Sequence, residues 1–304
     1  MMKLTRSTFL IILVAPLFLA NQDASANIDI VFDYRYDSSG FFTGANSSRQ
    51  NLLEAAASAF ETRFQDNLTP ISPSGSNTFD ASFFQPDNGN NTRLSNFSVA
   101  ANQIVVFAGA YNIPGTLAVG GPGGFSGGGS SPFLDNARSR GQEGALLSPP
   151  TDYGPWGGAI SFNSTSNWYF DPDTRTTEPF ANKYDFYSVA VHELAHVLGF
   201  GTAKSFENLT SGNMFTGTAV NDLLGFSPTL SGGHWTEGFS YLGQEAAMDP
   251  GITPNLRKYF TELDYAAMND IGWQVSPIPE MEIWAMMLAG LGLLGWSGAV
   301  CGRG

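Results

Sequence analysis

Cysteine, histidine and charged side chains are all scarce in this chain of 304 residues. With a single cysteine, Cys301, no disulfide can form within the chain, which excludes the small secreted folds held together by disulfides. Charged residues make up 13% of the sequence, about half the usual share in globular domains. Lys and Arg total 14 against 27 Asp and Glu, and this net charge of −13 argues against a nucleic-acid partner, which needs a basic face.

Glycine and proline are abundant, at 35 and 17 residues, which indicates a loop-rich protein that contains β-strands. Residues 1–26 have the pattern of a secretory signal peptide. Lys3 and Arg6 precede an apolar run at 9–20, and an Ala-Ser-Ala cleavage site follows at 24–26. The alternative, a transmembrane anchor, would require a longer apolar run. The mature chain is therefore expected to begin at Asn27.

A second apolar run lies in the tail formed by residues 277–304. Residues 283–301 carry no charge and are enough to cross a membrane as a helix. The alternative, a buried core helix, is disfavoured by the four glycines in this run. The order Pro279-Glu280, apolar span, Arg303 resembles the PEP-CTERM sorting signal of Gram-negative bacteria. That resemblance implies export to the cell surface or medium, transient membrane anchoring through the tail, and an exosortase-type sorting enzyme as partner.

Residues 27–276 are expected to form one domain of the α+β class. Alternating or continuous apolar residues predict strands at 28–34, 103–111 and 158–163. Helical spacing predicts helices from Ser47 or Ser48 to about Phe64, at 184–200, and at 261–271 with a Thr261/Asp264 capping box. The polar stretch 67–96 and the Gly/Ser-rich stretch 120–131 are expected to be loops.

The helix expected at 184–200 contains the motif His192-Glu193-Leu194-Ala195-His196. Histidines four residues apart project from one helical face, where two imidazoles can bind the same Zn²⁺ ion. Glu193 lies beside the first ligand and can take a proton from a zinc-bound water. This is the HExxH arrangement of zinc peptidases. The alternative is a pair of structural histidines, but the apolar helix and Gly199 behind the motif favour a metal site.

A catalytic zinc site needs a third protein ligand. Thr202 occupies the position six residues after His196 and is a poor zinc ligand. The remaining histidine, His234, is the first candidate. Acidic side chains downstream of the motif are the alternatives: Glu207, Glu237 and Glu245.

The motif, the inserted segment and the pieces after it resemble the leishmanolysin-like branch of the metzincins, whose third ligand follows an insertion. The residues that carry the resemblance are HELAHVLGF at 192–200, GGHWTE at 232–237, EAAMDP at 245–250 and MNDIGW at 268–273. It implies a metzincin-like fold with a mixed twisted sheet, an active-site helix and a C-terminal helix. It also implies that Met248 is the Met-turn residue beneath the metal, and that 158–163 is the edge strand above the cleft.

Together these features predict a secreted zinc endopeptidase that hydrolyses protein or peptide substrates by Glu193-assisted attack of a zinc-bound water. One catalytic Zn²⁺ is expected. Ca²⁺ is possible at acidic loops such as Asp171-Pro172-Asp173, although no EF-hand spacing is present. The alternatives are a non-catalytic surface or extracellular-matrix protein with a degenerate metalloprotease-like fold, and a zinc hydrolase that acts on a non-peptide amide.

Overall fold

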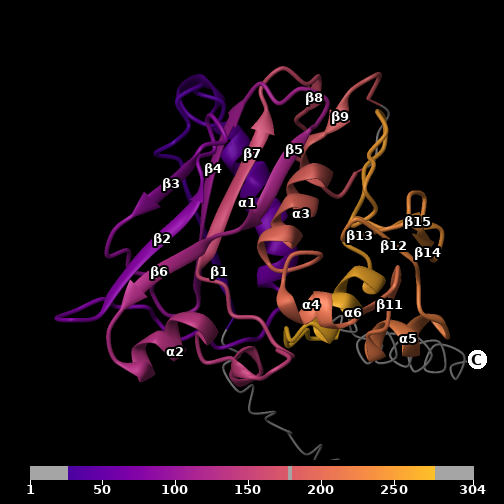
Figure 1. Ribbon diagram of the computed structural model, residues 1–304. Helices are drawn as coiled ribbons and strands as arrows, with labels where there is room; N and C mark the ends of the chain where they lie inside the picture. The colour runs from indigo at the N-terminus through magenta and orange to yellow at the C-terminus, as the bar shows by residue number, and fades with distance from the viewer. Residues whose placement is uncertain (1–26, 177–179, 278–304) are drawn as a thin grey trace, which may run out of the picture.

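The computed structural model describes residues 27–176 and 180–277 (Figure 1). The expected signal peptide at 1–26 and the apolar run at 283–301 lie outside these ranges. Among the described residues, no helix combines the length and apolar character needed to cross a membrane. The helices are α1 Ser48–Glu61, α2 Ser131–Ser139, α3 Phe186–Val197, α4 Lys204–Asn208, α5 Thr218–Leu224 and α6 Glu262–Asp270, with 3-10 turns at Gly44–Asn46 and Glu143–Leu146.

The strands form one larger sheet and several small ones. The larger strands are β1 Asp29–Asp33, β2 Thr78–Phe84, β3 Asn91–Leu94, β4 Gln103–Tyr111, β5 Ala118–Pro122, β6 Gly124–Gly128 and β7 Gly157–Asn163. Two-residue strands follow: β8 Trp168–Tyr169, β9 Tyr184–Asp185, β10 Thr210–Ser211, β11 Met214–Phe215, β12 Leu230–Ser231, β13 His234–Trp235, β14 Ser240–Tyr241 and β15 Gln244–Glu245. The α+β class expected from the sequence is confirmed.

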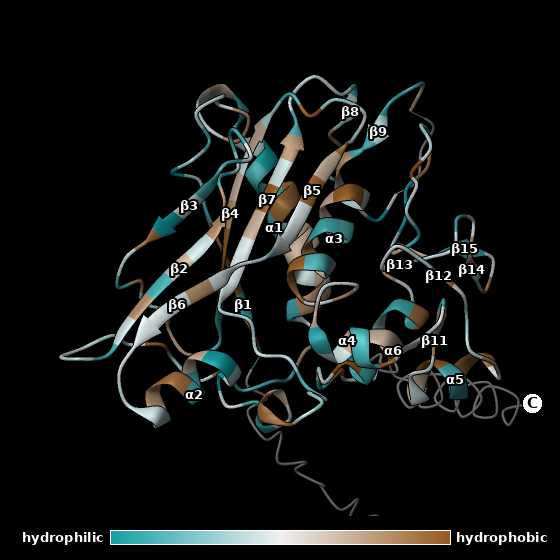
Figure 2. Cartoon of the chain, in the orientation of Figure 1, coloured by the Kyte–Doolittle hydropathy of each residue, from teal (hydrophilic) through white to brown (hydrophobic). Residues whose placement is uncertain are grey.

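The main sheet has the order β1-β4-β7-β5 and is mixed. β1, β4 and β7 run parallel, whereas β5 is antiparallel to β7. Successive residues of β4 enter different cores: Ile104 and Val106 pack with the helices, while Val105 and Phe107 pack with a second sheet. In Figure 2 hydrophobic colours run along these central strands, whereas β3 at the margin is mostly hydrophilic. Burial on both faces explains why β4 reads as an almost continuous apolar run.

The second sheet has the order β3-β2-β6 and packs on the main sheet through aromatic side chains. Phe83 of β2 stacks on Phe107 of β4 with ring centroids 4.0 Å apart, and Trp156 joins the same cluster. Its strands correct two expectations, since 67–96 and 120–131 were expected to be loops. β2 alternates between buried and half-buried residues, which marks a strand with one face in the core.

The glycines of β6 have a packing role that composition alone does not reveal. A Cβ atom at Gly127 would lie 2.1 Å from the carbonyl oxygen of Thr78 on β2. Only glycine allows the two strands to approach so closely. A stretch that is typical of a flexible linker is therefore a strand.

Three predicted helices are confirmed as α1, α3 and α6, and they contribute to the main core. The Asp185 side chain caps α3 by accepting from the backbone N–H of Ser188. Thr261 and Asp264 form the predicted capping box of α6. Two of these helices, α1 and α3, pack against each other, and α3 also lies along β5 (Figure 1).

The strand beside α3 differs from the one expected. Residues 158–163 belong to β7, which has β4 on one side and β5 on the other. The prediction that this segment is the edge strand is therefore wrong. β5 occupies the edge, where it pairs antiparallel with β7, and it contacts α3.

Candidate metal centre

His192 and His196 lie on α3, and the turn after the helix completes their environment. The helix stops because Gly199 adopts φ +106°, a conformation that L side chains rarely adopt. The chain then brings the carbonyl oxygen of Phe200 2.9 Å from Nδ1 of His196. Thr202, six residues after His196, donates its hydroxyl to the carbonyl of His196, so it turns back to the helix end.

The third histidine comes to the same point from β13. The Nε2 atoms of His192 and His196 are 3.1 Å apart, those of His196 and His234 are 2.9 Å apart, and those of His234 and His192 are 3.1 Å apart. Two nitrogens bound at about 2.0–2.1 Å to one tetrahedral ion lie about 3.3 Å from each other. The three atoms thus form a nearly equilateral triangle of the size required for three ligands of one metal ion.

The other ring nitrogens determine the tautomers. Each Nδ1 faces a backbone carbonyl: Ala247 for His192 at 2.7 Å, Phe200 for His196 at 2.9 Å, and Gly232 for His234 at 3.1 Å. A carbonyl only accepts, so each Nδ1 carries the proton and donates it. All three Nε2 lone pairs therefore point toward one another, which is the outer-sphere arrangement of metal-bound histidines.

Burial keeps these rings neutral. It is the main cause that lowers the pKa of all three histidines, to about 4 for His196, and neighbouring imidazoles lower the pKa of His192 and His196 further. Three neutral rings whose lone pairs converge repel one another unless a cation lies among them. The donor set therefore fits a divalent metal ion that accepts imidazole nitrogen.

Glu193 lies next to the histidines and is buried, with 7% of its surface exposed. Burial raises the pKa of its carboxyl to about 8, and the backbone N–H of Gly120 on β5 partly offsets this rise. A nearby cation would favour the charged form again. A carboxylate with such a pKa is suited to proton transfer near neutral pH.

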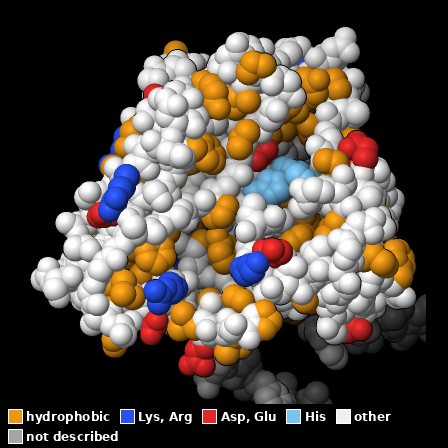
Figure 3. Space-filling view, viewed as in Figure 1, with side chains coloured by type: hydrophobic (Ala, Val, Ile, Leu, Met, Phe, Trp, Pro, Cys, Tyr) orange, Lys and Arg blue, Asp and Glu red, His pale blue; other side chains and the backbone are white. Residues whose placement is uncertain are grey.

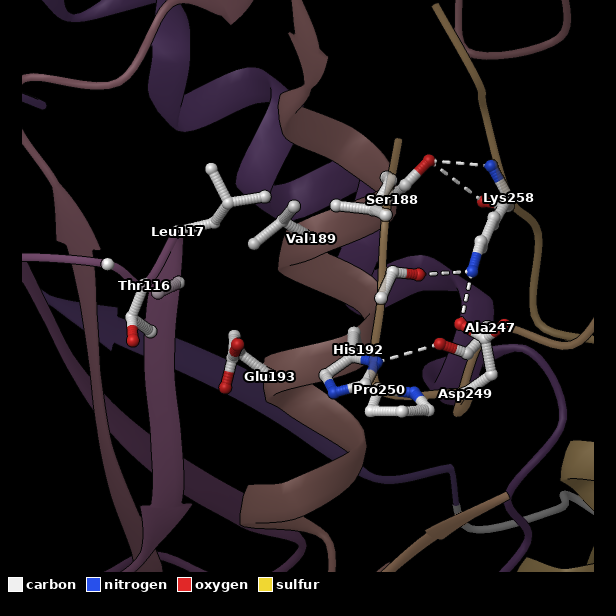
Figure 4. Close-up of a pocket in the computed structure, with 14 residues that line it drawn as sticks. Thr116, Leu117, Ser188, Val189, His192, Glu193, Ala247, Asp249, Pro250 and Lys258 are labelled. Carbon is white, nitrogen blue, oxygen red and sulfur yellow. Dashed lines mark hydrogen bonds and ion pairs between the residues drawn. The ribbon is translucent and has the colours of Figure 1, made fainter. Parts of the chain in front are cut away.

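A cavity of about 240 Å³ opens beside these groups and is lined by both His192 and Glu193. Figure 4 shows the two side chains projecting from α3, between Leu117 on one side and the turn at 247–250 on the other. Figure 3 shows the histidines grouped in a hollow at the middle of this face, next to an acidic side chain. The candidate metal site is thus reachable from solvent.

The structure separates the acidic alternatives from the histidines. Glu207 forms an exposed ion pair with Lys204 at 2.6 Å. Glu237 and Glu245 belong to a second group with Asp249, where Lys258 supplies the positive charge.

The acidic loop considered for Ca²⁺ is also neutralised by side chains of the chain itself. The Asp171 carboxylate pairs with buried Arg257 at 3.1 Å, and Asp173 pairs with Arg175 at 2.9 Å.

Met248 is fully buried in the turn that contains Ala247. Its backbone carbonyl accepts from the N–H of Trp235, so the turn is joined directly to β13.

The carbonyls of Ala247, Phe200 and Gly232, and the N–H of Gly120, are site groups that sequence reasoning missed. The sequence gives no signal for them, because these backbone groups do not depend on which side chain a residue carries.

No family model, no curated protein and no solved structure matches this chain.

Proposed function

We propose that this protein is a zinc-dependent endopeptidase with a metzincin-like fold. The observation that carries the proposal is the convergence of three unprotonated Nε2 atoms in a hollow that also holds a buried carboxylate. The residues around this hollow supply three neutral nitrogen ligands and a candidate general base. These are the protein groups that a catalytic zinc site requires. The Met-turn role of Met248 and the exported location belong to the same proposal.

The residues divide the chemistry among them. A bound zinc ion supplies a Lewis acid that activates water and polarises a carbonyl. His192, His196 and His234 hold the ion, and their Nδ1–H groups keep the rings fixed through backbone carbonyls. Glu193 takes the proton from the attacking water and passes it to the leaving amine. The close approach of β5 at Gly120 confines Glu193 while it does so.

Substrate would reach the site along β5. This strand is the edge of the main sheet and contacts α3, so an extended peptide that pairs with the edge would place its scissile bond near Glu193. Export rests on the signal-like residues 1–26, and transient anchoring on the sorting-like tail at 277–304.

The test replaces the base and leaves the ligands in place. In the purified full chain, Glu193→Gln should keep about one zinc per chain and should lower the hydrolysis of a peptide library by about 10²–10⁴-fold, the usual contribution of a general base. Glu207→Gln, at an exposed ion pair, is the matched control and should behave as wild type. Metal content is measured by elemental analysis and hydrolysis by mass spectrometry.

Full peptidase activity in Glu193→Gln would contradict the proposed mechanism. A wild-type chain without bound metal and without hydrolysis of any library peptide would instead favour a non-catalytic surface or matrix protein. Bound zinc together with cleavage of non-peptide amides alone would indicate a different hydrolase.

A further inference from the structure

We infer that Asp264 is a positioning residue for the metal centre: a single buried carboxylate joins the two segments that orient the ligand histidines. This inference rests on the proposed metal site. Asp264 lies in the first turn of α6 and is fully buried. Oδ1 accepts from Trp235 Nε1 at 2.8 Å and from the Met248 N–H at 3.4 Å, and Oδ2 accepts from the Ala247 N–H at 3.1 Å.

The capping of α6 accounts for only part of these contacts. A capping box requires two bonds: Oδ2 accepts from the Thr261 N–H at 2.8 Å, and the Thr261 hydroxyl oxygen accepts from the Asp264 N–H at 3.3 Å. The Thr261 hydroxyl also donates to Oδ2 at 2.7 Å. The three other donors come from outside the helix, one from β13 and two from the turn at 247–248. The capping of α6 does not explain these three hydrogen bonds.

One connection leads to His192. Asp264 holds the N–H of Ala247, and the carbonyl of the same residue accepts the Nδ1–H of His192 at 2.7 Å. The carboxylate therefore determines where that carbonyl lies, and the carbonyl determines the ring orientation and tautomer of His192. Such outer partners of a metal ligand usually contribute 10–100-fold to metal affinity or activity.

A second connection leads to His234. Trp235 follows this ligand directly on β13, is fully buried, and donates its indole N–H to Asp264. Its ring packs edge-on against Phe200, with centroids 5.2 Å apart, and Phe200 supplies the carbonyl that accepts from His196. The indole held by Asp264 thus contacts the segments of the two remaining ligands.

Two variants test this inference by separating metal affinity from folding. Asp264→Asn places an amide N–H₂ where donors already converge, and Trp235→Phe removes the indole bond together with part of the buried ring. We expect the zinc dissociation constant of the full chain, measured by competition with a chromophoric chelator, to rise about 10–100-fold in Asp264→Asn. It should rise by a smaller factor in Trp235→Phe. Urea unfolding of the metal-free chains gives the stability change separately.

Asp270→Asn is the matched control because it lies on the same helix and its carboxylate also accepts backbone N–H groups. Asp270 accepts from Ala219 and Val220 at the start of α5, away from the histidines. This variant should be less stable but should bind zinc as wild type does.

Three outcomes decide the inference. If Asp264→Asn and Trp235→Phe are destabilised yet bind zinc with the wild-type constant, Asp264 is structural only and the inference is wrong. If Asp264→Asn does not fold, the zinc constant of Trp235→Phe decides alone. A wild-type chain that binds no zinc overturns both this inference and the proposed function, whereas unaltered binding in the variants overturns only this inference.

Discussion

At the scale of single residues, the position of Glu193 depends on the absence of a side chain at Gly120. β5 runs so close to α3 that a Cβ atom at Gly120 would lie 2.5 Å from the carbonyl oxygen of Glu193 and 2.7 Å from its Cβ. The backbone N–H of Gly120 also lowers the pKa of the Glu193 carboxyl, against the larger effect of burial. The absence of a side chain at Gly120 is therefore required for the approach of the strand to the proposed base.

Gly120→Ala should displace Glu193 and lower peptide hydrolysis about 100-fold, the effect expected from a misplacement of about 1 Å. The three histidines are held by the backbone carbonyls of Ala247, Phe200 and Gly232, which are not part of β5, so zinc content should stay at the wild-type level. Gly121→Ala is the control, because the nearest atom to its added Cβ is Phe84 Cε1 at 3.9 Å. Equal activities of the two variants, measured on one peptide substrate, would contradict the role assigned to Gly120.

The site residues differ in how far the sequence predicts them. The HExxH spacing predicts that His192 and His196 share a helix face, because helical geometry alone brings them together. For His234 the sequence gives only a candidate ligand. Its approach to the other two histidines depends on the packing of β13 against the turn at Met248. For Asp264 the capping box is predictable from Thr261, whereas its bonds to Trp235 and Ala247 arise only in the folded chain.

At the scale of elements, the metal would join parts of the chain that are otherwise held by short strands. α3 supplies two ligands and β13, a strand of two residues, supplies the third. Only the folded chain brings these nitrogens together, so an ion held there would bind the native state in preference to the unfolded one. Such an ion would act as a cross-link between the helix and the hairpin.

Removal of zinc should lower the stability of the whole chain. A ligand present at 100 times its dissociation constant stabilises the native state by about 2.7 kcal/mol. For a domain of this size, each kcal/mol corresponds to about 2–4 °C in the melting temperature. Chelation with EDTA should therefore lower the melting temperature by several degrees, and added zinc should restore it. Identical melting curves of the chelated and zinc-loaded chain would contradict a metal site at these histidines.

The predictable elements share a physical feature. α1, α3, α6 and β4 have apolar residues at the spacing of their own secondary structure, so local pattern and fold agree. β6 does not, because its glycines are needed for contact with the backbone of Thr78, far away in the chain. The edge position of β5 also depends on strand pairing, which the local sequence does not contain.

At the scale of the whole molecule, the last described residues close the fold against the end of α1. Trp273 stacks on Phe64 with centroids 4.8 Å apart and donates its indole N–H to the carbonyl of Leu198 behind α3. Asp66 accepts the backbone N–H of Gln274 at 3.0 Å in the same region. The segment thus connects the first helix with the end of the helix that carries the metal motif.

Asp66 makes this closure sensitive to pH. Burial is the main cause that raises the pKa of its carboxyl from the ordinary value of 3.8 to about 6, and Asp152 adds to the rise. Oδ1 has no hydrogen-bond partner among the described residues. The folded chain therefore holds a proton that the unfolded chain releases between about pH 4 and pH 6. The resulting stabilisation is complete below about pH 4 and is lost as the pH rises through 6.

Asp66→Asn removes this titration and keeps an oxygen that can accept from Gln274. The difference between the two pKa values corresponds to about 3 kcal/mol, an upper limit for the gain in unfolding free energy at pH 8. We expect the variant to be more stable than wild type at pH 8 and similar to it at pH 4, as measured by urea unfolding at several pH values. Asp222→Asn, which removes the same charge from the exposed surface of α5, is the control and should follow wild type. If Asp66→Asn loses stability between pH 4 and pH 8 as steeply as the control does, the Asp66 carboxyl is not the group that couples this closure to pH.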